Sequence, residues 1–235
     1  MNSDILILCA TKLEISPYLQ TLIPCDTEQI GHELPIYSAR FQRQRIRILI
    51  TGPGVFNTAR ALTVCLEKYR PDLIIQAGIA GVFKETGLSI GDSVIATSER
   101  YIHVGIQSDN AMPKPLPFDL IEGEMTTKEG FYQFNPRIVD EYYTNILRQK
   151  IPLEKGAVIT VSTITSSFEQ AGMIYNACSS KMAAMEGAAA IHVAFLYRIP
   201  ILEIRSASNF VGERDKTKWN VEKAAYNLSE ILACI

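Results

Sequence analysis

The sequence has no excess of charge of either sign: 23 Lys and Arg residues against 25 Asp and Glu residues leave a net charge of −2. Basic side chains form no stripe or tail, which argues against nucleic acid or an anionic membrane as a partner. Long hydrophobic runs are also missing, and the apolar run at residues 5–10 is far too short to span a bilayer. That run follows Asp4 rather than a basic region, which is untypical of a signal peptide. We therefore expect a cytoplasmic protein.

Cysteine and histidine are few and scattered. The five cysteines form no CxxC pair, and the three histidines have no metal-ligand spacing. This pattern favours reduced cysteines and structural histidines over disulfides or a zinc site. The glycine runs match neither the dinucleotide fingerprint nor the phosphate-binding loop of nucleotide hydrolases. We expect neither a metal nor a cofactor.

Apolar segments are abundant, since 47% of the 235 residues are hydrophobic, enough to fill a sizeable core. Short apolar runs predict strands at residues 5–9, 46–51, 73–77, 93–97, 157–161 and 201–206. Helices are predicted at residues 57–69 and 218–235 from the spacing of apolar residues. Two more are predicted at 136–149, which opens with proline, and at 180–197, which is rich in alanine. Their alternation predicts a three-layer α/β/α sandwich with a mostly parallel, mixed central sheet. We expect one domain over residues 1–235, with a surface loop at 110–130 of the kind that often covers a site.

The ends of the predicted strands carry glycine, hydroxyl or charged residues. Ligands of open α/β sheets bind beyond the carboxyl ends of strands, which selects residues 11–14, 51–57, 78–81, 162–167 and 208–215. The glycine runs at 51–54 and 78–81 are predicted as strand-to-helix turns, and each alone is also consistent with an ordinary turn.

Three polar residues stand out against these segments. Glu14 follows the first strand, where a surface carboxylate at a helix start is also consistent. Glu186 lies inside an apolar, small-residue run predicted as helix, and a lone buried glutamate is costly unless it is paired or functional. Asn209 follows the last predicted strand, a position where asparagine is usually a turn residue.

Six segments in order, from Ile5 to Asn209, carry a family resemblance: ILILCATKLE, TGPGVFNTARAL, QAGIAGVF, GDSVIATSERY, MEGAAAIHVA and RSASN. Together they resemble the superfamily of purine nucleoside phosphorylases and methylthioadenosine nucleosidases. The resemblance implies a nucleoside phosphorylase-like fold, a purine nucleoside as small-molecule ligand, and a homodimer or larger homo-oligomer. The later segment SNFVGERD, followed by Trp219, resembles the futalosine hydrolase branch, which releases hypoxanthine from futalosine in menaquinone biosynthesis.

The resemblance assigns roles to individual residues. Glu14 matches the residue that activates water, and Glu186 matches the glutamate that binds the ribose hydroxyls. Met185 would pack on the ribose, although a core methionine is nearly as consistent. Gly78 and Ile79 would contact the substrate in the third-strand motif.

Asn209 departs from the aspartate of nucleosidases that release adenine. An asparagine cannot act as an acid, but it can donate to a 6-oxo group and accept from N7–H, which favours hypoxanthine or guanine as the leaving base. Arg214 either pairs with Asp215 or meets the benzoate of futalosine. Phe210 and Trp219 would form an apolar wall, with core packing the favoured account of Trp219.

The choice between water and phosphate as the nucleophile also follows from the resemblance. Related phosphorylases carry an arginine and a serine or threonine where this chain has Gln76 and Ile79. A phosphate dianion needs several donors, and Glu14 would repel it, so we predict hydrolysis of futalosine. Two alternatives stay open: a methylthioadenosine/adenosylhomocysteine or aminodeoxyfutalosine nucleosidase that releases adenine, and a non-catalytic nucleoside-binding protein.

Overall fold

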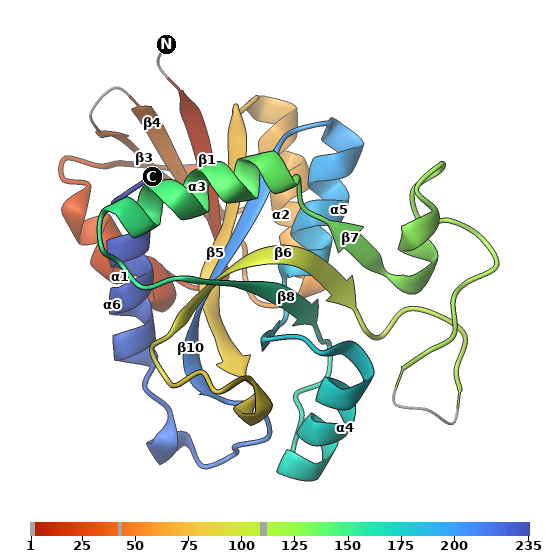
Figure 1. Cartoon of the computed structure of the whole chain (residues 1–235). Helices are drawn as coiled ribbons and strands as arrows, with labels where there is room; N and C mark the ends of the chain where they lie inside the picture. Colours follow the sequence, from red (N-terminus) through yellow and green to blue (C-terminus); the bar gives the residue numbers. More distant parts are fainter. Residues whose placement is uncertain (1–2, 42–43, 109–111) are drawn as a thin grey trace.

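The computed structural model describes residues 3–41, 44–108 and 112–235, and its centre is a mixed sheet (Figure 1). All six predicted strands are present, with parallel pairing from β4 through β1 to β5 and on to β10, and from β6 to β8. Their bounds are β1 (Asp4–Cys9), β4 (Gln44–Ile50), β5 (Leu73–Val82), β6 (Ser93–Tyr101), β8 (Glu154–Thr160) and β10 (Ile201–Phe210). The predicted α/β fold with a mixed sheet is confirmed.

One part of the sheet closes on itself. The strands β5, β9 (Met182–Ala184), β8, β6 and β10 pair in that order, and β10 pairs with β5 again. On the other side of β5 the sheet continues through β1 and β4 to an antiparallel edge formed by β3 (Leu34–Phe41) and β2 (Asp26–Ile30). The short strand β7 (Phe131–Gln133) pairs with β6. The closed part brings strands far apart in sequence around one small interior.

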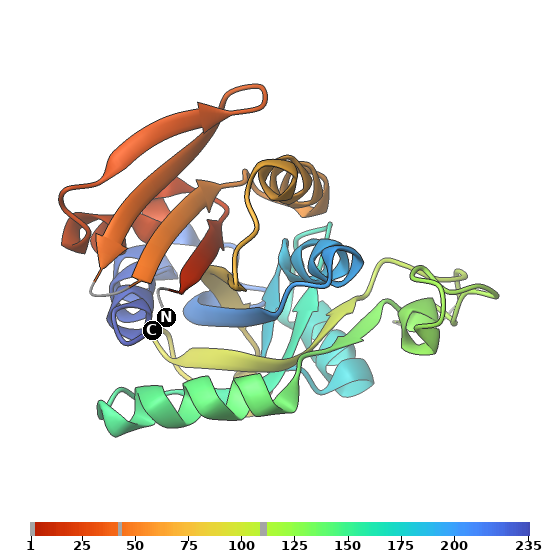
Figure 2. The same ribbon diagram turned by 90° about the horizontal axis from the view of Figure 1, so that it is seen from above.

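Helices cover both faces of the sheet, as Figure 2 shows from above. The helices α2 (Val55–Lys68) and α5 (Gly187–Tyr197) pack together, as do α1 (Lys12–Thr21) and α6 (Val221–Leu232). The helix α3 (Pro136–Arg148) lies along β6, and α4 (Phe168–Cys178) follows β8. Residues 5–9 of β1 are all buried, as expected for an apolar strand covered on both faces.

Four predicted local structures are wrong, and the first three errors involve site residues. The predicted helix at 180–197 is split, because its first residues form β9 and α5 begins only at Gly187. Residues 78–81 remain inside β5 and do not form a turn, and Asn209 lies inside β10 rather than after it. The last helix begins at Val221, after the short 3-10 helix η3 (Lys216–Lys218). Backbone pairing with neighbouring strands outweighs the local turn and helix signals in the first three of these segments.

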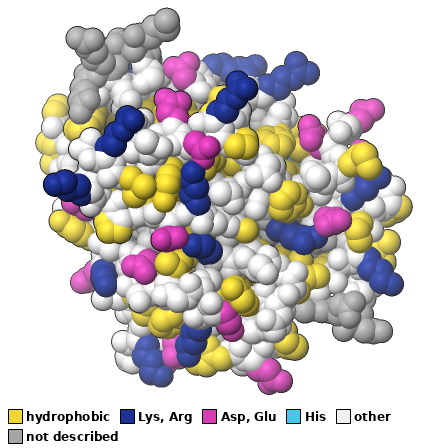
Figure 3. Space-filling view, in the orientation of Figure 1, with side chains coloured by type: hydrophobic (Ala, Val, Ile, Leu, Met, Phe, Trp, Pro, Cys, Tyr) yellow, Lys and Arg dark blue, Asp and Glu magenta, His cyan; other side chains and the backbone are white. Residues whose placement is uncertain are grey.

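The surface has mixed charge. In the face shown by Figure 3, Lys and Arg side chains are interspersed with Asp and Glu side chains. Among the described residues, no helix has both the length and the apolar character needed to cross a bilayer.

Candidate active site

A cavity of about 250 Å³ lies where β5, β8 and β10 end. Seven of the residues selected from the sequence line it: Glu14, Ile79, Met185, Glu186, Asn209, Arg214 and Trp219. Gly78 lies directly behind the lining, and Phe210 packs against the hydrophobic core instead. The predicted loop at 110–130 does not contribute to the lining in its described part, and residues 110–111 lie outside the described residues.

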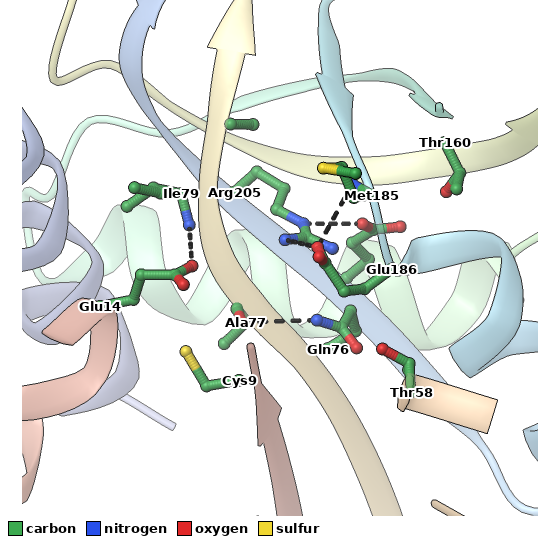
Figure 4. A network of polar contacts seen from close by, with 12 residues as sticks. Cys9, Glu14, Thr58, Gln76, Ala77, Ile79, Thr160, Met185, Glu186 and Arg205 are labelled. Carbon is green, nitrogen blue, oxygen red and sulfur yellow. Dashed lines mark hydrogen bonds and ion pairs between the residues drawn. The ribbon is translucent and has the colours of Figure 1, made fainter. Parts of the chain in front are cut away.

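Glu14 is held at the first turn of α1. Thr11 caps this helix, and its hydroxyl donates to Glu14 Oε1 at 2.7 Å. The backbone N–H of Ile79 donates to Glu14 Oε2 at 3.0 Å, which ties the carboxylate to β5 (Figure 4). Burial raises the pKa of Glu14 above its usual range, although both hydrogen bonds lower it. A glutamate with a raised pKa is suited to accept a proton near neutral pH.

Glu186 lies at the residue before α5 and not inside a helix. Its Oε1 accepts from the backbone N–H of Gly54 at 3.0 Å, and its Oε2 accepts from Met185 N at 3.3 Å and Arg205 Nη1 at 3.1 Å. Gly54 has a φ of 89°, which glycine adopts easily and which aims its N–H at the carboxylate. The turn at 51–54, predicted from its glycines, therefore holds Glu186.

Arg205 on β10 connects Glu186 with a further buried carboxylate, Glu203. It is fully buried, and its Nε donates to Glu203 Oε1 at 2.8 Å. Burial alone would lower the pKa of Arg205, but the charges of Glu203 and Glu186 outweigh burial and raise it. A Cβ on Gly78 would lie 2.6 Å from Arg205 Nη1 and 2.9 Å from Glu14 Oε2, so glycine leaves room for both groups. The guanidinium is therefore permanently charged between the site carboxylates.

Asn209 faces the cavity from the irregular end of β10, where the pairing with β5 shifts register between Ala207 and Asn209. The Ser208 hydroxyl donates to Asn209 Oδ1 at 2.8 Å, and Asn209 Nδ2 donates to the carbonyl of Phe210 at 2.9 Å. These bonds fix the orientation of the amide. One N–H and one oxygen lone pair remain for a ligand.

Arg214 lies at the rim of the cavity with Trp219. The guanidinium carbon is 6.0 Å from the centroid of the Trp219 ring, and both residues line the cavity. Asp215 pairs instead with Lys218 at 3.9 Å, so among the described residues the alternative Arg214–Asp215 salt bridge is not formed. The apolar wall expected from Phe210 is not part of the lining either.

Sequence reasoning missed three buried charged residues: Glu99 on β6, and Glu203 and Arg205 on β10. Glu203 and Arg205 were counted as part of the apolar strand at 201–206, and Glu99 follows the strand predicted at 93–97. The cost of burying a lone charge, which singled out Glu186, applies equally to a strand reading ILEIRS and would have found two of them.

Fold and cavity together define an α/β enzyme that presents two carboxylates, a guanidinium and an amide to a small polar ligand. The chain belongs to the phosphorylase superfamily, whose family model matches residues 4–235. The predicted superfamily is thereby confirmed.

Relatives within this family are named nucleosidases. The 5′-methylthioadenosine/S-adenosylhomocysteine nucleosidase of Maridesulfovibrio salexigens is 26% identical over 226 residues, which cover 94% of this chain and 93% of the relative. The corresponding enzyme of Bacillus subtilis is 24% identical over 229 residues, or 95% of this chain and 94% of the relative. We therefore describe the chain as a nucleosidase-type enzyme.

Solved structures share the fold. The native futalosine hydrolase of Helicobacter pylori aligns with a TM-score of 0.83 at 19% identity, covering 99% of this chain and 96% of that chain. The methylthioadenosine/adenosylhomocysteine nucleosidase of Colwellia psychrerythraea, in complex with adenine, gives a TM-score of 0.83 at 20% identity, covering 100% of this chain and 94% of the other.

Proposed function

We propose that the chain hydrolyses the N-ribosidic bond of futalosine and releases hypoxanthine. The observation that carries this proposal is Asn209, an amide that lines the same cavity as Glu14 and Glu186. Its remaining N–H and lone pair match the 6-oxo acceptor and the N7–H donor of a 6-oxopurine. The 6-amino group of adenine would instead place a donor against the amide N–H.

The proposed reaction uses water as the nucleophile. The water oxygen forms a bond to the anomeric carbon, its proton passes to Glu14, and the bond to the purine breaks with the electron pair leaving on the base. The base then gains a proton from solvent. The Glu186 carboxylate accepts hydrogen bonds from the ribose hydroxyls with its remaining lone pairs, and its negative charge stabilises the cationic sugar of the transition state.

Arg214 supplies the proposed preference for futalosine over simpler nucleosides. Its guanidinium lies at the cavity rim beside Trp219, and the Asp215 carboxylate is paired with Lys218. A guanidinium binds a carboxylate through paired N–H groups, and the benzoate of futalosine is such a group. The indole ring beside it offers an apolar surface for the aromatic part of the benzoate.

The second candidate is hydrolysis of methylthioadenosine or adenosylhomocysteine with release of adenine. It is favoured by the names of the relatives at 24–26% identity, which cover nearly the whole chain. Both candidates give Glu14 and Glu186 the same roles, and they differ in the purine that is released.

The test is to incubate the protein with futalosine, inosine and methylthioadenosine, with and without phosphate, and to identify the released base by chromatography. Hypoxanthine from futalosine without a phosphate requirement supports the proposal, and adenine from methylthioadenosine supports the second candidate. The matched variant Asn209→Asp should shift preference toward the adenine nucleoside by about 10-fold or more, because the carboxylate accepts from the 6-amino group. An unchanged preference would remove Asn209 from the argument.

A further inference from the structure

Two buried glutamates lie next to Gly187, the first residue of α5. Glu99 projects from β6 and Glu203 from β10, and both side chains are fully buried. Glu99 Oε1 accepts from the Thr160 hydroxyl at 2.8 Å, and Glu203 Oε1 accepts from Arg205 Nε at 2.8 Å. Each glutamate therefore has one oxygen with a donor.

The second oxygen of each glutamate has no donor among the described residues. Both of these oxygens lie over the α-carbon of Gly187: a Cβ built there would be 2.5 Å from Glu99 Oε2 and 2.6 Å from Glu203 Oε2. Two buried carboxylates at such close range cannot both stay charged. If one of the two oxygens carries a proton, its O–H donates to the other oxygen, and both then have a hydrogen-bond partner.

The surroundings decide which glutamate keeps the proton. Glu203 is paired with the Arg205 guanidinium at 2.8 Å. Glu99 faces a neutral hydroxyl, Thr160, and the ring of Tyr132 on β7 is the further titratable group near it. Burial raises the pKa of Glu99 well above its usual range, and the charge of Glu203 raises it further, against the smaller lowering by the Thr160 hydrogen bond and the Arg205 charge.

We propose that Glu99 is a protonated positioning residue: its Oε2–H donates to Glu203 Oε2, and Glu203 in turn fixes Arg205 between Glu203 and Glu186. The pair then carries one negative charge, which the Arg205 guanidinium balances. A second charge on Glu99 would draw Arg205 away from Glu186 and out of its place behind the cavity. This role in catalysis rests on the proposed nucleosidase function, whereas the shared proton does not.

Infrared spectroscopy of the whole protein near neutral pH tests the proton directly. The wild type should show the C=O band of a protonated carboxylic acid, shifted in D₂O and absent from Glu99→Gln. In Thr160→Val the band should move to higher frequency, because the carbonyl loses the hydrogen bond from the threonine hydroxyl. If the wild type has no such band, the proposal is overturned, and a band without any nucleoside turnover supports the shared proton while overturning the proposed function.

Kinetics test the positioning role. Glu99→Gln keeps a neutral donor toward Glu203, so its kcat should stay within about threefold of the wild type, since hydrogen bonding is conserved. Glu99→Leu keeps the burial but loses the donor, and its kcat should fall about tenfold to a hundredfold, the usual value of a hydrogen bond to a charged group. Equal losses in the two variants would overturn the role. If Glu99→Leu does not fold, Thr160→Val serves instead and should lower kcat more than Glu99→Gln does.

Discussion

Replacing Arg205 by methionine tests the charge network at the centre of the site. The side chain is fully buried and bonded to Glu203 at 2.8 Å and to Glu186 at 3.1 Å. Removal of the guanidinium leaves two buried carboxylates without their cation, which costs about 3–5 kcal/mol. At about 2–4 °C per kcal/mol for a chain of this size, Tm should fall on the order of 6–20 °C.

Thermal unfolding measured at two pH values separates this cause from poor packing. Acid neutralises the orphaned carboxylates, so the deficit of Arg205→Met against the wild type should shrink as pH is lowered. The control is Lys155→Met, which breaks an exposed pair with Asp140 and should lower Tm by only a few degrees, since such pairs contribute about 0–1 kcal/mol. A deficit for Arg205→Met no larger than that of Lys155→Met, or one equal at both pH values, would refute the reasoning.

Three further variants test single features of the site. Glu14→Gln should lower kcat by about 100-fold or more at little cost in KM, and because burial raises the pKa of Glu14, the kcat/KM of the wild type should fall as pH drops through that raised value. Above this pKa, Glu14→Gln should also unfold at a higher denaturant concentration than the wild type, because the wild type must bury a charged carboxylate. This advantage should disappear below the pKa that Glu14 has in the unfolded chain. A stability difference that is the same at all pH values would contradict the raised pKa. Arg214→Ala should raise KM for futalosine about tenfold and leave inosine unchanged, and an unaltered KM for futalosine would exclude Arg214 as the benzoate ligand. Gly187→Ala should lower the free energy of unfolding by about 1–3 kcal/mol in denaturant, because its Cβ would lie 2.5 Å from Glu99 Oε2. The control Gly172→Ala in α4, where the nearest contact of the added Cβ is 3.5 Å, should be neutral or stabilising. Similar values for the two variants would contradict the crowding at Gly187.

Apolar patterning located the centre of the fold but not its edges. The buried strands, such as β1 and β10, read as near-continuous apolar runs and were predicted. The edge strand β2 escaped prediction because its sequence DTEQI is polar and mostly exposed. The strand β9 is only three residues long and is held by pairing with β5 and β8, which no local pattern records.

The sequence identified single residues of the site more readily than the contacts between them. Glu14, Glu186 and Asn209 stood out in the sequence, and all three line one cavity. What linked Glu186 to Arg205 was the closure of the sheet, in which β9 and β10 pair with β5 on its two sides through long-range contacts. The orientation of the Asn209 amide likewise depends on the register shift in β10, which the sequence does not reveal.

The two parts of strand β10 that carry site residues are paired differently. Between Ile204 and Ser206 it is bonded to β5 on one side and β6 on the other, and this segment carries Arg205. Beyond the register shift, Asn209 and Phe210 pair with β5 alone. Arg205 therefore lies where β10 is paired on both sides, and Asn209, to which we assign base recognition, lies where β10 pairs with β5 alone. If Asn209 reads the base as proposed, one substitution there would redirect the enzyme to another purine and leave the charge network around Arg205 intact, which is a route by which related nucleosidases could diverge.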